Sequence, residues 1–290
     1  MLDGIAFLRV GYSEHLDRST SWWPHGFQAC FALSVNLDTE SSDVEIGGSP
    51  VRRSSHGNYV AEEGCALILE LLAAMSIEAT FFVSASDALE YPELVTRIVN
   101  AGHEAACHEV KYRSQSLFDT TASGELEAAC SAVTHVVGTS PIGWRATRAR
   151  LAANVLRRVA GMGFQYDASF VDSDLPYFID LGERSLVEIP KHPLLDDRTL
   201  NCAGISDVHQ EDLWKGELVP MIEDGLLYSL NVNPRSDVGT AWGSKLDKLY
   251  RLIELANAEG DIWFATHADI ARWWSRKAAE GTLPLRKWTF

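Results

Sequence analysis

Short apolar runs alternate with helical segments along most of this chain, and this alternation constrains the fold more than any other feature. The first strand-like run extends from Cys30 to Leu37, a helical pattern follows at 61–75, and a second apolar run extends from Glu78 to Ser84. Strands that are separated by helices of this length pair in parallel, because the helix carries the chain back across the sheet. We therefore expect an α/β fold built on a parallel sheet.

The same alternation continues toward the C-terminus. Further strands are expected at 104–108, 142–144, 166–169, 186–189, 226–232 and 262–265, and further helices at 92–100, 121–137, 152–162, 212–223, 245–258 and from residue 268. No linker rich in Pro, Gly or Ser interrupts this pattern. The sequence predicts a single (β/α) barrel domain over 1–290, with an N-terminal arm at 1–29, a polar loop at 39–59 and a C-terminal tail at 283–290.

The charge balance limits the classes of partner. The 290 residues include 40 acidic and 25 basic side chains, a formal charge of −15, whereas nucleic-acid binding depends on clustered Lys and Arg that neutralise phosphate. Nucleic acid and membrane surfaces are therefore not expected as partners. No apolar run is long enough for a signal peptide or a membrane span, so we expect a cytoplasmic protein. The five cysteines are widely spaced and odd in number, which favours reduced core residues.

Polar and ionisable residues collect where the predicted strands end. In a (β/α) barrel, the C-terminal ends of the strands form the face that carries the chemistry. The residues at these ends are Asp38, Glu40, His108, Trp144, Arg145, Glu188, Asn231, Asn233 and His267. Asp38 and Glu40 are two residues apart, so we expect both to face one pocket. The alternative role for this pair is to brace the loop that follows.

Several motifs at these positions resemble those of the NodB-type polysaccharide deacetylase family. They are Asn36-Leu37-Asp38-Thr39-Glu40, Ala79-Thr80-Phe81-Phe82-Val83, Gly102-His103-Glu104, the histidine motif that begins at His108, Gly143-Trp144-Arg145, and Ile262-Trp263-Phe264-Ala265-Thr266-His267. The resemblance extends from about Trp23 to Trp274. It implies a distorted (β/α) barrel, an Asp as general base, and a divalent metal held by a second acidic residue and two histidines four residues apart. It also implies a late histidine as general acid.

Two positions depart from that family pattern. Tyr112 stands where the resemblance places the second histidine, and Asn233 stands at the position of the late histidine. A phenol, with a pKa of about 10, is a poor zinc ligand compared with imidazole, and an amide has no proton to exchange near neutral pH. We therefore expect a degenerate metal site and no bound cofactor. The alternative is a weak divalent metal site made by Asp38, Glu40 and His108, with water in place of the missing ligand.

One branch of the fold, the PuuE-type allantoinases, resembles this chain more closely in that respect. Its members carry an aromatic residue in place of the second histidine and are regarded as metal-independent. Gly143-Trp144 and Asp172-Ser173-Asp174-Leu175-Pro176-Tyr177 also resemble that branch, whereas its first motif and late histidine are not matched by Asp38 and Asn233. The resemblance implies descent from C–N hydrolases rather than allantoin as the substrate.

The catalytic candidates are Asp38, Glu40, His108 and Arg145. Asp38 would be the general base, while Glu40 and His108 would position water or substrate. Arg145 would bind a carbonyl oxygen, or pair with an acidic residue and hold it ionised. A structural role for His108, bonded to a backbone carbonyl, is the alternative for that residue.

The substrate-binding candidates are His56, Tyr112, Trp144 and Asn233. His56 lies at the end of the long polar loop, where it would act as a lid or else lie at the surface. The Asn233 amide can donate to an oxyanion without a metal. Tyr112 would contact the substrate or fill the space of the absent histidine. His192, Asp196 and Asp197 are further candidates.

These residues favour a hydrolase that acts on the C–N bond of a small amide, ureide or N-acyl compound without the usual divalent metal. A metal-dependent deacetylase with an incomplete site is one alternative. A catalytically inactive protein, or one repurposed as a cyclase or lyase, is another. The expected partners are a small-molecule substrate and further copies of the same chain, because members of the resembling family assemble into homo-oligomers.

Overall fold

One curved sheet is the framework of the computed structural model, which describes residues 22–24, 26–39, 50–108, 123–146, 153–281 and 287–289. Within these ranges ten strands form a single sheet in the order β10-β6-β7-β5-β4-β3-β2-β1-β8, and β9 also pairs with β1. The strands are β1 (Ala29–Asn36), β2 (Thr80–Val83), β3 (Glu104–His108), β4 (Gly143–Arg145), β5 (Tyr166–Asp167), β6 (Tyr177–Asp180), β7 (Ser185–Glu188), β8 (Leu227–Val232), β9 (Ile262–Phe264) and β10 (Lys287–Thr289). All neighbours pair in parallel except β6 and β7. This arrangement confirms the predicted distorted (β/α) barrel.

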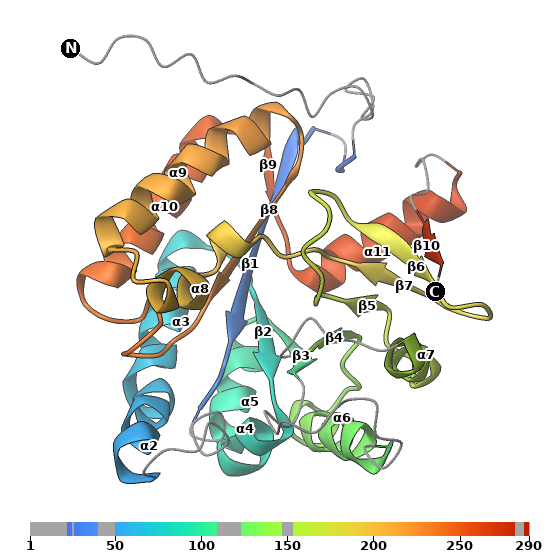
Figure 1. The fold of residues 1–290 in the computed structure, drawn as a ribbon, viewed down its shortest axis with the longest axis horizontal. Helices are drawn as coiled ribbons and strands as arrows, with labels where there is room; N and C mark the ends of the chain where they lie inside the picture. The colour runs from blue at the N-terminus through green and yellow to red at the C-terminus, as the bar shows by residue number, and fades with distance from the viewer. Residues whose placement is uncertain are drawn as a thin grey trace.

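Helices surround the outer side of the sheet (Figure 1). They are α2 (Pro50–Tyr59), α3 (Cys65–Met75), α4 (Ala85–Glu90), α5 (Pro92–Asn100), α6 (Ser123–Val137), α7 (Ala153–Gly161), α8 (Asp197–Cys202), α9 (Asp207–Glu223), α10 (Ser244–Glu259) and α11 (His267–Ala279). Pro92 stands at the start of α5, and Ser84 and Asp87 form a capping box at the start of α4. No helix in the described ranges has the length and apolar character needed to cross a membrane.

The barrel is not closed, because the strand order ends at β10 on one side and at β8 on the other. The chain from Ile189 to Arg198, here called the crossing segment, leads from the end of β7 to the edge strand β8. Its Lys191 N–H donates to Phe170 O (2.8 Å), and its Asp196 forms an isolated parallel bridge with Asn231 of β8. The crossing segment therefore follows the C-terminal end of β7 and lies at the same end of the sheet as the predicted site residues.

The predicted polar loop at 39–59 is wrong in its second half, which is helical. Helix α2 continues through a π-helical turn (Val60–Gly64) into α3. Its Ser, Gly and Asn residues are weak helix formers, so the local composition does not predict a helix here. Long-range contacts stabilise it instead: Tyr59 Oη donates to Ala241 O (2.7 Å), and His56 Nδ1 lies 2.8 Å from Ser236 Oγ. Residues 40–49 lie outside the described part of the chain.

The two ends of the chain add to the sheet region. Strand β10 lies within the predicted tail at 283–290 and pairs with β6, a strand that the sequence did not indicate. Most of the predicted arm at 1–29 lies outside the described residues, but Trp22 and Trp23 are buried. Trp23 Nε1 donates to Gly225 O (2.8 Å), and the Trp22 ring stacks on Trp274 with centroids 6.1 Å apart. The described end of the arm is thus part of the core.

Candidate functional site

Arg145 lies at the centre of the inner face of the sheet, where register pairs it with His108 of β3. Its donors reach Ala168 O (2.9 Å), Ser34 Oγ (3.1 Å), Asn36 Oδ1 (3.0 Å) and Asn231 Oδ1 (2.7 Å). The guanidinium also lies 3.6 Å above the Phe82 ring. Burial lowers the pKa of Arg145 to about 10, so the group stays charged at neutral pH. Within the described ranges Arg145 has only neutral partners at hydrogen-bond distance, which leaves its charge available to a ligand.

The backbone at Asp38 is held in an uncommon conformation directly after β1. Its φ angle is +35°, in the left-handed region that few residues other than glycine adopt. Leu37 N donates to Phe82 O (3.1 Å) before it, and Thr39 N donates to Asp87 Oδ1 (3.3 Å) after it. Arg235 Nη1 donates to the Asp38 carbonyl oxygen (3.2 Å). These contacts on both sides fix the direction in which the Asp38 side chain leaves the strand end.

The Asp38 carboxylate is buried between a cation and an imidazole. Arg198 Nη1 donates to Asp38 Oδ2 (3.0 Å), and His108 Nδ1 lies 3.6 Å from Oδ1. Burial, together with the charges of Arg145, Lys191 and Arg198, lowers the pKa of His108 to about 3, and Asp87 opposes them. His108 is therefore a neutral imidazole at physiological pH. The 3.6 Å separation is long for a hydrogen bond, so His108 and Asp38 are close neighbours rather than a hydrogen-bonded pair.

His267 closes the inner face below Arg145. It begins α11, is fully buried, and places Nε2 3.5 Å from Arg145 Nη2. Burial and the charge of Arg145 lower its pKa well below the ordinary value, so it is neutral. If Arg145 donates to Nε2, the ring proton is on Nδ1, which has no partner in the described part of the chain. His267 thus packs against the guanidinium rather than against Asp38.

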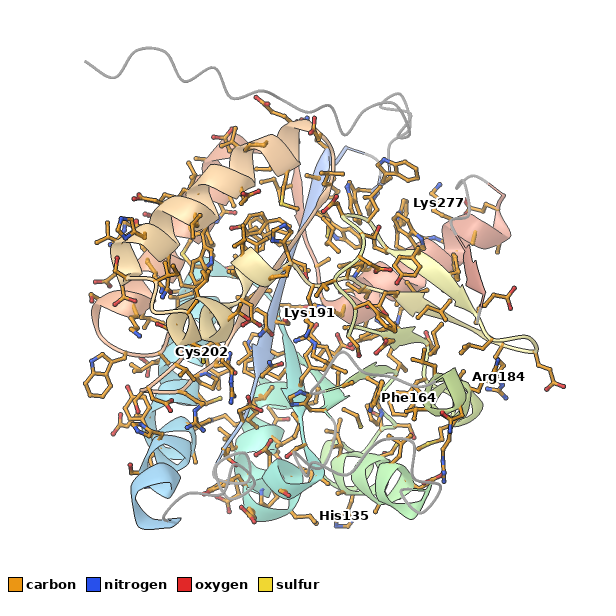
Figure 2. The ribbon with its side chains drawn as sticks, viewed as in Figure 1. His135, Phe164, Arg184, Lys191, Cys202 and Lys277 are labelled. Atoms are coloured by element: carbon orange, nitrogen blue, oxygen red, sulfur yellow. The ribbon has the colours of Figure 1, made fainter. Side chains whose placement is uncertain are left out.

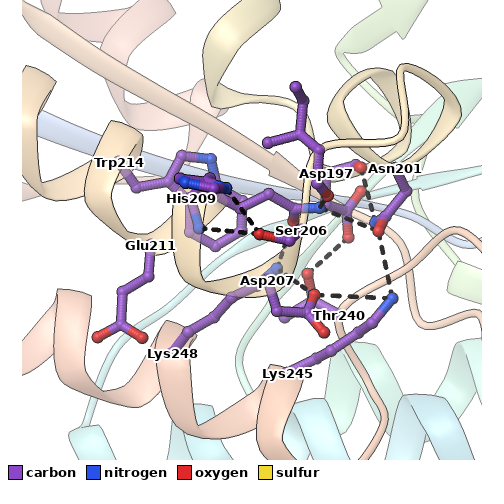
Figure 3. Close-up of polar contacts among 12 residues, drawn as sticks. Asp197, Asn201, Ser206, Asp207, His209, Glu211, Trp214, Thr240, Lys245 and Lys248 are labelled. Atoms are coloured by element: carbon purple, nitrogen blue, oxygen red, sulfur yellow. Dashed lines mark hydrogen bonds and ion pairs between the residues drawn. The ribbon is translucent and has the colours of Figure 1, made fainter.

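Asn233 is buried in a separate polar network. Its backbone N–H and its Nδ2 donate to the Asp197 carboxylate (2.8 and 2.7 Å), which also accepts from Thr240 Oγ1 (2.8 Å). The network continues through Asn201 to Lys245 and reaches Asp207 and Lys248 between α9 and α10 (Figure 3). The Asn233 amide N–H is therefore already used, and the position predicted for an oxyanion donor has a clear structural role.

The other predicted residues occupy different places. Trp144 precedes Arg145 in β4, so it points to the opposite face of the sheet; it is buried, and its indole Nε1 has no partner within the described ranges. His56 lies on α2, where it contacts Ser236 of the chain that follows β8. Glu40 and Tyr112 lie outside the described residues. The structure thus brings Asp38, His108 and Arg145 together.

Sequence reasoning missed the residues that surround Asp38. Arg198 and Lys191 belong to the crossing segment, Asp87 to α4, and Arg235 to the chain after β8. The signal for Asp87 was present, because Ser84-x-x-Asp87 is a helix-start pattern three residues after a strand. The crossing segment has neither helical nor strand periodicity, so its placement over the site depends on tertiary structure alone.

Asp38 and His108 carry the donor atoms that a divalent metal would use at this place. Across the described ranges, however, no group of three His, Cys, Asp or Glu side chains is arranged to hold a metal ion. Arg198 occupies Asp38 Oδ2, and three positive side chains act on His108. By themselves, the described residues therefore do not make a divalent-cation site.

Known proteins resemble the chain in both sequence and structure. The family model for polysaccharide deacetylases matches residues 57–166. A peptidoglycan deacetylase of Helicobacter pylori is 26% identical over 170 residues, which are 49% of this chain and 57% of that protein. The chain thus spans a little over half the length of this curated relative.

Solved structures match over nearly the whole chain. A Mycobacterium smegmatis protein that is assigned as a polysaccharide deacetylase has a TM-score of 0.82 and 28% identity. The match covers 91% of this chain and 95% of that one. PuuE allantoinase has a TM-score of 0.78 and 22% identity, with coverage of 92% and 96%. A Pseudomonas aeruginosa protein assigned to the same class has a TM-score of 0.79 and 23% identity, with coverage of 92% and 97%. Together with the open barrel and the motifs at its strand ends, these matches show that the chain is similar to NodB-type polysaccharide deacetylases in sequence and shares their fold.

Proposed function

We propose that the protein hydrolyses a C–N bond, other than a peptide bond, in a small amide, ureide or N-acyl compound, and that it does so without a divalent metal. The observation that carries this proposal is the Asp38 carboxylate, which is buried, aimed by a constrained backbone and held by Arg198 at 3.0 Å. Similarity to this family supports hydrolysis as the reaction class. The positive side chains around His108 support chemistry in which protein cations take the place of a metal.

Asp38 acts as the base in this mechanism. Its carboxylate accepts a proton from a water molecule as the water oxygen bonds to the carbonyl carbon. The developing oxyanion is stabilised by the charge of Arg145, whose Nη2 group has a single contact in the described ranges, the one with His267. When the C–N bond breaks, the proton on Asp38 passes to the leaving nitrogen. Neutral His108 orients the water and does not supply the proton, because its pKa of about 3 leaves it uncharged.

The substitution Asp38→Asn tests this role because it keeps the shape of the side chain and removes the base. We expect kcat/KM to fall by about 10²–10⁴-fold, the usual contribution of a general base. The substrates to assay are allantoin, followed by loss of the cyclic ureide as its ring opens, and N-carbamoyl amino acids, N-acetyl amino acids and N-acetylglucosamine oligomers, followed by release of ammonia, amine or acetate. The matched control is Asp247→Asn, an exposed position on α10 that should leave activity unchanged. Full activity of Asp38→Asn would eliminate the mechanism.

A deacetylase of N-acetylated sugars is the second candidate. The family model and the Helicobacter pylori relative favour it. Acetate release from N-acetylglucosamine oligomers, with no turnover of ureides or small amides, would select this candidate over the first. If no compound is turned over and ligands still bind, with Asp38→Asn binding as the parent does, the chain is a binding protein rather than an enzyme.

A further inference from the structure

Lys191 places a positive charge at the site from the crossing segment. Its backbone N–H donates to Phe170 O (2.8 Å), a hydrogen bond between the chain that follows β7 and the chain that follows β5. This bond fixes the backbone from which the Lys191 side chain leaves. Figure 2 shows Lys191 near the middle of the molecule. The side chain is half-buried. Lys191 thus reaches the part of the barrel in which Arg145 and His108 lie.

The ammonium group of Lys191 has no hydrogen-bond or ion-pair partner within the described ranges. Asp196, Glu188 and Asp167 are near enough to act on it electrostatically, and Arg145 opposes them. Asp196 accepts from Asn231 Nδ2 (2.8 Å) and Thr199 N (2.7 Å), and Glu188 Oε1 accepts from Phe170 N (2.8 Å). Asp167 Oδ2 and Glu188 Oε2 are buried without a hydrogen-bond partner in the described ranges, but neither lies at ion-pair distance from Lys191. A half-buried ammonium without a direct partner is costly to the free protein, and a ligand anion would supply that partner.

The neighbouring charges favour an anion at this place. Arg145, Lys191 and Arg198 all act as positive charges on His108. Arg198 is paired with Asp38, whereas Arg145 and Lys191 have no carboxylate at ion-pair distance in the described part of the chain. Asp196, Glu188 and Asp167 also act on Lys191 and Arg145, but within the described ranges none of them lies at ion-pair distance from either cation. A buried and a half-buried cation without a paired carboxylate favour a ligand anion.

We propose that the substrate is a small carboxylate, held by Lys191 through its carboxylate group while its C–N bond faces Asp38. The compound would be an N-acyl or ureido acid rather than a neutral ureide. An ammonium group is a compact point charge suited to one carboxylate. Only the placement of the C–N bond at Asp38 rests on the proposed hydrolysis. Binding of a carboxylate by Lys191 does not require turnover.

The test compares succinate with succinamide, a neutral molecule of nearly the same shape, by isothermal titration calorimetry. We expect the parent protein to bind succinate at least about tenfold more tightly, the value of one charge-assisted contact. Lys191→Met should abolish this preference, and Lys191→Arg should keep most of it. The control is Lys277→Met on α11, far from Lys191 in Figure 2, which should keep the full preference.

Equal binding of succinate and succinamide by the parent protein would overturn the proposal, and so would an unchanged preference in Lys191→Met. The parent comparison decides the matter even if Lys191→Met fails to fold, and circular dichroism identifies that case. Loss of hydrolysis in Asp38→Asn is a separate result. A protein that prefers succinate but hydrolyses nothing would keep this inference and remove the proposed function.

Discussion

Gly64 offers a sharp test of how the π-helical turn packs against the chain that follows β8. A Cβ added to Gly64 would lie 2.0 Å from Pro234 O and 3.0 Å from Pro234 C. An ordinary C···O contact is about 3.4 Å, so one of the two backbones must move by about 1.4 Å. Overpacking of this kind costs about 1–3 kcal/mol, and a rigid carbonyl places Gly64→Ala at the upper end. Alanine recovers about 1 kcal/mol through helix propensity, so the net loss should be about 2 kcal/mol.

Gly216→Ala is the matched control. Gly216 is an exposed helical position on α9, and a Cβ there would meet nothing within 4 Å. Only the higher helix propensity of alanine remains, so the free energy of unfolding of this variant should rise by about 1 kcal/mol. Urea unfolding followed by tryptophan fluorescence gives both values from the midpoint shifts, provided that the slopes are unchanged. A Gly64→Ala protein as stable as the parent, or stabilised like Gly216→Ala, would refute the close packing described here.

Further predictions concern Asp197 and metal removal. Burial raises the pKa of Asp197 to about 7, above the ordinary 3.8, so its protonated form stabilises the fold at low pH and that contribution is lost as pH rises from about 4 to about 7. The free energy of unfolding of the parent, relative to that of Asp197→Asn, should therefore fall between about pH 4 and about pH 7 and stay constant above that range. If the difference between the two proteins does not change with pH, the raised pKa of Asp197 is contradicted. Hydrolytic activity should survive exhaustive chelation, and elemental analysis should find well under one divalent ion per chain. One ion per chain, with activity lost on chelation and restored by metal, would show that Asp38 and His108 work with a metal after all.

Much of the fold was predictable because local signals and packing agree. Helix α5 begins at Pro92 and ends before Gly102, and β3 ends at His108, all as the sequence indicated. Helix α2 was missed because its stability comes from contacts with residues 236 and 241 rather than from its own composition. The short strand β6 was missed because it pairs antiparallel in an otherwise parallel pattern.

The site was predictable in part for a related reason. Strand ends converge by geometry, so Asp38, His108 and Arg145 could be grouped from the sequence. The partners of Asp38 could not, because Arg198 arrives from a segment 160 positions away that has no periodic pattern. Asn233 also lies at a strand end, but Asp197 binds its amide within the interior. Position on a strand thus identifies the neighbourhood of a residue without identifying its partner.

The residues around the site come from two different parts of the protein, the sheet and the crossing segment. Asp38, His108 and Arg145 are held at the ends of strands of the sheet. Lys191 and Arg198 belong to the crossing segment, which is held to the sheet by Ile189 N–H donating to Asp167 O (2.9 Å) and by the bridge between Asp196 and Asn231. Lys191 and Arg198 are only partly buried, whereas Ile189, Leu195 and Asp197 of the same segment are buried. We therefore expect that substitutions at Lys191 and Arg198 can change what the protein binds while the strands keep their arrangement.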